Sequence, residues 1–160
     1  MKLKFNLLVL VALSFSFTAC KYNAVQLLTK ADANYILEVE SGACYGTCPI
    51  YTFKLDENRN LDFKGGRHCA FEGDTTLAIS AEDYQKLKES LIKKGFFGMD
   101  SVYDYEEMMD VPNYIISVSD PKGKFKTQRV RGRVEYPDEF GDLKTEIGEL
   151  LVKYGMLGRV

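Results

Sequence analysis

Cys44-Tyr45-Gly46-Thr47-Cys48-Pro49 is the stretch of sequence around which the rest of the fold is arranged. Two cysteines four positions apart enclose a glycine, and a proline follows the second cysteine. Residues with the alternating pattern of β-strands lie on both sides. Glycine permits a tight backbone turn, and a disulfide between the two cysteines would close a very short loop. The stretch therefore predicts a covalently closed corner between two strands.

Alternation of apolar and polar residues predicts about five strands. Two of them, residues 35–40 and 50–56, flank the corner, and residues 61–71 return antiparallel to the second strand after a turn. Residues 114–119 and 124–134 form a second predicted hairpin, because the turn-forming tetrapeptide Asp-Pro-Lys-Gly lies between them.

Apolar residues at helical spacing predict two helices. The first begins after Ser80, which can cap it, and ends at Gly95, while the second begins at Pro137 and continues to about residue 154. The predicted fold class is therefore α+β, with an antiparallel sheet of about five strands and two helices packed on one face.

The amino terminus has the pattern of a bacterial lipoprotein signal peptide. Lys2 and Lys4 precede an apolar run over residues 5–17, and small residues stand directly before Cys20. The run is shorter than the about 20 residues that span a bilayer. We expect cleavage before Cys20 and attachment of a diacylglyceryl group, with acyl chains such as palmitate, to its thiol. The alternative is an ordinary secreted protein that is cut nearby, with Cys20 free or in a disulfide.

This pattern divides the chain into three parts. Residues 1–19 form the signal peptide, residues 20–33 form the lipidated cysteine and a tether, and residues 34–160 form a single domain. Lys21 follows the cysteine in place of an aspartate that would favour retention in an inner membrane. We therefore expect an exported protein, lipid-anchored to the outer membrane and facing the periplasm or the cell surface.

Composition excludes several classes of function. Removing residues 1–19 takes away two lysines and no acid, so the formal net charge changes from -2 to -4. A mildly acidic domain without a basic stripe argues against nucleic acid as a partner. His68 is the one histidine of the sequence, so a histidine-based catalytic triad or metal site would have to use it. No nucleophile with a nearby base, phosphate-binding loop or paired carboxylates stands out, so we assign no catalytic residue and no cofactor.

The three cysteines of the mature domain leave the disulfide pairing open. Cysteines of exported proteins are by default in disulfides. A bond between Cys44 and Cys48 closes a short loop, whereas a bond between Cys48 and Cys69 requires a bulge that corrects the register of the predicted hairpin. The spacing favours the first pairing, with Cys69 as a small buried residue.

The cysteines have two further functional interpretations, a redox-active pair and a zinc site. A redox-active pair usually has two residues between its cysteines and lies at the start of a helix, whereas this pair has three and precedes a strand. Zinc could be bound by Cys44, Cys48, His68 and Cys69. However, His68 and Cys69 are adjacent in a predicted strand and would point to opposite faces, so we expect His68 to be an exposed strand residue.

Two charged segments have weaker functional interpretations. The acidic loop 100–110 could hold calcium but lacks the spacing of a calcium loop, so a solvated loop is favoured. Basic residues alternate along the second hairpin and form either a charged strand exterior or a cationic face for anionic lipid headgroups or polysaccharide. They are Lys122, Lys124, Lys126, Arg129, Arg131 and Arg133.

The motif Cys44-Tyr45-Gly46-Thr47-Cys48-Pro49-Ile50-Tyr51, together with Gly95-Phe96-Phe97 and Asp110-Val111-Pro112, resembles the family catalogued as domain of unknown function 6438. The resemblance covers about residues 34–153. It implies an exported bacterial protein that is often lipid-anchored and has no established activity. It also implies that Cys44 and Cys48 are the pair of the family.

The sequence thus favours a lipid-anchored cell-envelope domain that is more a binding or interaction module than an enzyme, with a protein or polymer partner. Tyr45 and Thr47, at the tip of the corner, are the candidate interaction residues. The alternative is a thiol-disulfide active or zinc-binding envelope protein that uses Cys44, Cys48 and Cys69.

Overall fold

A computed structural model describes residues 19–29, 33–104 and 111–158, with only the backbone for residues 19–23. The predicted signal peptide, apart from Ala19, and the side chain of Cys20 lie outside the described residues. The α-helices are α2 (Ala19–Leu28), α3 (Ala81–Lys93) and α4 (Asp138–Lys153), and a 3-10 helix, η1, spans Phe96–Gly98. The strands are β1 (Ile36–Ser41), β2 (Tyr51–Leu55), β3 (Asn60–Gly65), β4 (Gly73–Ala78), β5 (Val102–Tyr103), β6 (Tyr114–Ser119) and β7 (Gln128–Gly132).

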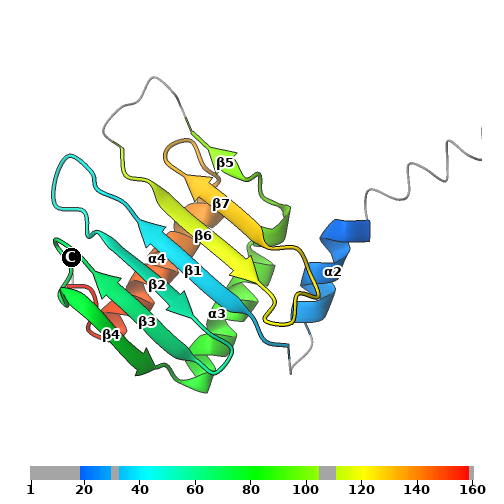
Figure 1. The fold of residues 1–160 in the computed structure, drawn as a ribbon. Helices are drawn as coiled ribbons and strands as arrows, with labels where there is room; N and C mark the ends of the chain where they lie inside the picture. Colours follow the sequence, from blue (N-terminus) through cyan, green and yellow to red (C-terminus); the bar gives the residue numbers. More distant parts are fainter. Residues whose placement is uncertain (1–18, 30–32, 105–110, 159–160) are drawn as a thin grey trace, which may run out of the picture.

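All of these strands form one sheet in the order β4-β3-β2-β1-β6-β7-β5. The neighbours pair antiparallel, except that β5 and β7 are parallel. Helices α3 and α4 lie across one face of the sheet, and α2 lies at the end where β1 begins (Figure 1). The central strand β1 is therefore hydrogen-bonded on both sides, and its two ends lie at opposite ends of the domain.

The α+β fold class is confirmed, but the prediction of an antiparallel sheet of about five strands with two helices is wrong in detail. The sheet is mixed and has seven strands, and the described residues include three α-helices. Strand β4 was not predicted from the sequence. It lies at the edge of the sheet and has no buried residues, so its sequence lacks the apolar alternation of the neighbouring strands. Strand β5 has only two residues, and α2 lies in the segment that we had interpreted as a tether.

The core lies between the sheet and α3 and α4. Leu37 and Val39 of β1 point into it, and Val39 is opposite Phe53 of β2 and Ile116 of β6. Burying such a side chain stabilises the fold by roughly 1.5–3 kcal/mol. The apolar stripe of α4 completes the core with Phe140, Leu143, Ile147 and Leu151, each 0% exposed.

The ends of the helices follow the signals in the sequence. The Ser80 side chain accepts a hydrogen bond from the backbone N–H of Asp83, which caps α3. Gly95 stops the chain after α3 with a φ of 66°, in the left-handed region that glycine adopts without strain. Pro137 is the residue before α4, where its missing N–H costs no hydrogen bond.

Candidate interaction surface

The corner between β1 and β2 is a closed loop. Cys44 and Cys48 form a disulfide with a Cα–Cα distance of 5.7 Å, and the N–H of Gly46 donates to the carbonyl oxygen of Cys44 at 2.9 Å. The Tyr45 side chain is 93% exposed, and Thr47 is also exposed. Among the described residues, the other large apolar side chains that are exposed are Phe71, at 37%, and Val102, at 52%. Tyr45 is therefore the most exposed large apolar side chain among the described residues.

Hydrogen bonds from three segments hold the base of the corner. Ser41 Oγ donates to the carbonyl oxygen of Pro49 at 2.9 Å, next to the second cysteine. The N–H of Gly42 donates to the carbonyl oxygen of Asn113, at the start of β6, at 2.8 Å. Ile50 makes two backbone hydrogen bonds with the β3–β4 loop. Its N–H donates to the carbonyl oxygen of Arg67, and its carbonyl oxygen accepts from the N–H of Gly66. The loop thus presents Tyr45 from a fixed base.

Glycine allows the β3–β4 loop to approach this base. A Cβ atom at Gly65 would lie 2.0 Å from the carbonyl oxygen of Phe71 and 2.8 Å from the ring of Phe63. A Cβ atom at Gly66 would lie 3.0 Å from the carbonyl oxygen of Ile50. A side chain at Gly65 would therefore force the β3–β4 loop to shift, and one at Gly66 would press against Ile50 at the base of the corner.

A shallow hollow of about 370 Å³ lies beside the corner. Ser41, Gly42 and Ile50 line it, together with Tyr51 and Asn113. Asn113 Oδ1 is buried and has no hydrogen-bond partner in the part of the chain that the structure describes. The corner thus has an exposed aromatic side chain on its loop and a hollow at its base. This arrangement suits binding of a partner, since aromatic residues are enriched at interfaces.

The structure separates the third cysteine from the disulfide. Cys69 is a half-buried free thiol that donates to the carbonyl oxygen of Ile50, with a sulfur–oxygen distance of 3.3 Å. Burial raises the pKa of the Cys69 thiol, which lowers its thiolate fraction and its reactivity. The disulfide lies in a loop between two strands and so lacks the helix start that lowers the pKa of the thiol in redox-active pairs.

The zinc prediction receives no support from the geometry. His68 is exposed and lies in a turn with a φ of 68°, so it is not the strand residue that we expected. Within the described ranges, no three His, Cys, Asp or Glu side chains are grouped so that they could hold a metal ion.

The predicted basic face is divided between two environments. Arg131 and Arg133 of the β7 region bind the Asp104 carboxylate at 2.7 and 3.0 Å, so both belong to an ion-paired cluster. Asp104 comes from the acidic loop, of which residues 105–110 lie outside the described residues. Lys122, Lys124 and Lys126 lie in the loop between β6 and β7 and are exposed.

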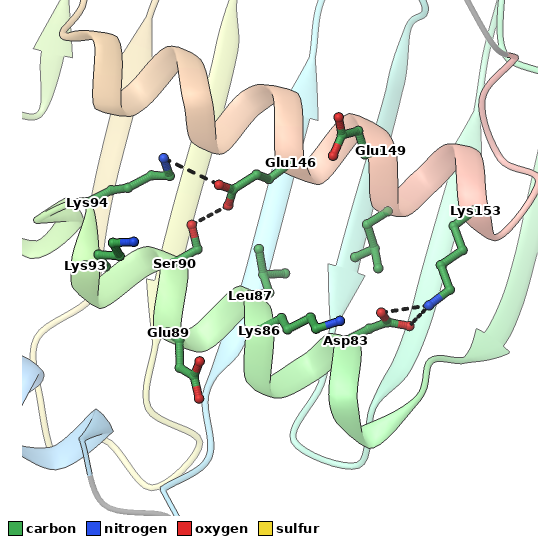
Figure 2. Close-up of a pocket in the computed structure, with 11 residues that line it drawn as sticks. Asp83, Lys86, Leu87, Glu89, Ser90, Lys93, Lys94, Glu146, Glu149 and Lys153 are labelled. Atoms are coloured by element: carbon green, nitrogen blue, oxygen red, sulfur yellow. Dashed lines mark hydrogen bonds and ion pairs between the residues drawn. The ribbon is translucent and has the colours of Figure 1, made fainter.

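A second concave surface, a groove of about 590 Å³, lies between α3 and α4. Figure 2 shows charged side chains of the two helices that meet across it. Lys94, the residue after α3, binds Glu146 of α4 at 3.4 Å, and Ser90 of α3 donates a hydrogen bond to the same carboxylate. Lys153 of α4 binds Asp83 of α3 at 2.7 Å at the other end of the groove (Figure 2).

Asp83 is the centre of this second contact. Its carboxylate accepts hydrogen bonds from Lys153, from Tyr154 and from the capping hydroxyl of Ser80. The bonds from Lys153 and Tyr154 lower the pKa of Asp83 to about 2. The groove is therefore bridged at both ends by ion pairs and hydrogen bonds that join α4 to α3 and to the residue after it.

The corner and the amino-terminal helix lie at opposite ends of β1 (Figure 1). Ala24 and Leu28 of α2 are buried, at 6% and 1% exposure, so the helix packs on the domain. Cys20 lies in the first turn of α2, four residues before Ala24. None of the helices that the structure describes has the length and apolar character needed to cross a membrane.

Comparison with known families identifies one family whose model covers most of the described domain. The model of the family described as "Domain of unknown function (DUF6438)" matches residues 35–151, and the chain belongs to this family. The matched segment begins just before β1 and ends in α4, so it contains the corner and the whole sheet. No curated protein matches the chain.

Proposed function

We propose that the protein is a lipid-anchored cell-envelope domain that binds a protein or polymer partner through the disulfide-closed corner. The observation that carries the proposal is the Tyr45 side chain, which is 93% exposed on a loop closed by a disulfide. A large aromatic side chain in contact with water is unfavourable in free energy, and a partner that buried this side chain would gain that free energy. A loop that is already ordered also loses little conformational entropy on binding.

The position of the corner supports an anchored binding module. A lipid on Cys20 would hold the domain by α2, and the corner lies at the other end of β1 (Figure 1). Tyr45 and Thr47 would then face away from the lipid, toward partners in the periplasm or outside the cell.

The partner is sought by photo-crosslinking in living cells. We would replace Tyr45 with the photoreactive residue p-benzoylphenylalanine and make the same replacement at Glu89, which is exposed on α3. Position 45 is expected to give a discrete cross-linked product and position 89 is not. Equal products from both positions, or none from position 45, would exclude the corner as the contact surface.

The anchor is tested by fractionation of cells that produce the Cys20→Ser variant. Because a diacylglyceryl group requires the thiol, the variant is expected to leave the membrane fraction, whereas the wild-type protein stays in it. Mass spectrometry of the amino-terminal peptide should show acyl chains on Cys20 in the wild type alone. Membrane association that survives the substitution would contradict the lipoprotein assignment.

A further inference from the structure

A loop with three exposed lysines lies beside the helix that begins at the proposed lipid site. Lys122, Lys124 and Lys126 alternate along the loop between β6 and β7. Lys122 and Lys124 line a pocket of about 240 Å³ together with Leu27 and Leu28 of α2. Figure 1 shows the same neighbourhood, with the β6–β7 loop next to α2.

Two interactions fix the conformation of this lysine loop. Asp120 accepts hydrogen bonds from the backbone N–H groups of Lys122 and Lys124, at 2.9 and 2.7 Å. Phe125 is 8% exposed and packs edge-to-face on Phe97, with 5.9 Å between the ring centroids. The phenylalanine between two lysines thus points into the domain, while the lysines on either side of it stay exposed.

The charges of the lysine loop are open to a partner. In the parts of the chain that the structure describes, no ion pair involves Lys122, Lys124 or Lys126. The nearby carboxylates are those of Asp120, which binds the backbone of the loop, and Glu57, which lines the same pocket. The other half of the basic hairpin differs, because Arg131 and Arg133 are bound to Asp104.

The connection between α2 and the domain restricts where a lipid can be. Cys20 precedes the buried Ala24 by four residues and Leu28 by eight, which corresponds to about 6 and 12 Å along a helix. Lys88 Nζ also donates to the carbonyl oxygen of Ala33, in the segment between α2 and β1. A lipid on Cys20 would therefore bring this end of the domain, with its lysine loop, close to the bilayer surface.

We infer that Lys122, Lys124 and Lys126 bind the phosphate groups of anionic phospholipids in the membrane that holds the anchor. This inference rests on the proposed lipid at Cys20. Lysines close to an anionic membrane surface are attracted to it, and the attraction falls off within a Debye length. With α2 packed on the domain, the lipid and the lysine loop together give two points of contact, so the domain has one preferred orientation on the membrane.

The experiment measures how fast each lysine reacts while the protein is on a membrane. The full lipidated protein is reconstituted into vesicles of phosphatidylcholine, or of phosphatidylcholine with phosphatidylglycerol, and sedimented to show that it is anchored. An amine-acylating reagent is then applied, and modified peptides are measured by mass spectrometry. Lys64 is exposed on β3, away from α2, and serves as the internal control.

We expect Lys122, Lys124 and Lys126 to react about threefold more slowly on the phosphatidylglycerol vesicles than on neutral ones, with Lys64 unchanged. Salt at about 1 M should remove the difference, since it shortens the Debye length to roughly 3 Å. Equal rates for the loop lysines on both vesicles, in protein that sediments, would overturn this inference and leave the anchor intact. Protein that fails to sediment would overturn the anchor itself, and the inference with it.

An acidic polysaccharide provides the competing outcome. If polygalacturonate slows the three loop lysines and the anionic vesicles do not, the lysine loop binds an envelope polymer and the assignment to phospholipid is wrong. Slower reaction with the vesicles alone supports the assignment.

Discussion

Tyr35 and Tyr84 hold each other through both their side chains and their backbones. The N–H of Tyr35 donates to Tyr84 Oη at 2.9 Å, and Tyr84 Oη donates to the carbonyl oxygen of Tyr35 at 2.8 Å. Tyr35 Oη donates to the carbonyl oxygen of Tyr84 at 2.9 Å, and the two rings stack with 4.4 Å between their centroids. This reciprocal contact joins the residue before β1 to the first half of α3.

Removing one hydroxyl from this contact is expected to destabilise the domain strongly. Tyr84→Phe leaves the N–H and the carbonyl group of Tyr35 without a partner in a buried position, which should cost about 2–4 kcal/mol. The free energy of unfolding in urea measures the loss. Tyr45→Phe is the matched control, because Tyr45 is exposed, and it should change that free energy by less than about 0.5 kcal/mol. Equal effects of the two variants would contradict the role of the Tyr35–Tyr84 contact.

Two glycine-to-alanine variants should have opposite effects. At Gly65 the new methyl group would lie 2.0 Å from the backbone oxygen of Phe71, and backbone atoms cannot move away easily, so we expect a loss of about 3 kcal/mol. At Gly148, in α4, no atom lies within 4 Å of the new methyl group, and the variant should gain up to about 1 kcal/mol from helix propensity. Thermal unfolding should show a lower melting temperature than that of the wild type for Gly65→Ala and a higher one for Gly148→Ala.

The contact between Asp83 and Lys153 should make stability depend on acid pH. The pKa of Asp83 in the folded protein, about 2, is below the usual value of 3.8. Its contribution is therefore fully present above about pH 4 and is lost as the pH falls toward 2. With allowance for the exposed Lys153 side chain, we expect about 1–2 kcal/mol.

The Asp83→Asn variant measures this contribution. The difference in free energy of unfolding between the wild type and the variant should be constant above about pH 5 and should shrink between pH 4 and pH 2. Asp142→Asn, which breaks the exposed contact with Lys94, is the control and should cost no more than about 1 kcal/mol. A difference at Asp83 that does not vary with pH would show that the carboxylate is not stabilised in its charged form.

The disulfide should raise the free energy of unfolding and protect Cys44 and Cys48 from alkylation. Replacing both Cys44 and Cys48 with serine opens a loop of five residues and is expected to cost about 2 kcal/mol. Among Cys44, Cys48 and Cys69, alkylation of the native protein without reductant should modify Cys69 alone, and slowly, because burial raises the pKa of its thiol. If a mild reductant opened the Cys44–Cys48 bond in the folded protein, the thiol-active alternative would regain support.

Strong local signals explain which parts of the fold could be predicted. The cap at Ser80, the stop at Gly95 and the strands on both sides of the corner follow from residue types whose backbone preferences are intrinsic. Strand β4 has the sequence Gly-Asp-Thr-Thr-Leu-Ala, and its place in the sheet comes from pairing with β3 and not from an apolar face of its own. Edge pairing of this kind depends on tertiary context, which a local pattern does not contain.

In the candidate surface too, some features follow from local sequence signals and others depend on tertiary contacts. The short spacing of Cys44 and Cys48 and the position of Tyr45 between them pointed to an exposed corner, and the structure places them there. The neighbours of the corner, Asn113 and Arg67, come from segments far away in the sequence, so their contact with it could not be read from spacing. The ion pairs of Asp104 with Arg131 and Arg133 depend in the same way on the parallel pairing of β5 with β7.

The place of β1 in the middle of the sheet has a mechanical consequence. A partner that pulls on the corner, against an anchor at the other end, applies force along the length of β1. The backbone of β1 is already extended and joins the two points of attachment covalently, so β1 itself carries this tension. The ladders to β2 and β6 bear little of the load, and the sheet should withstand tension along this axis better than tension that peels β4 from its edge.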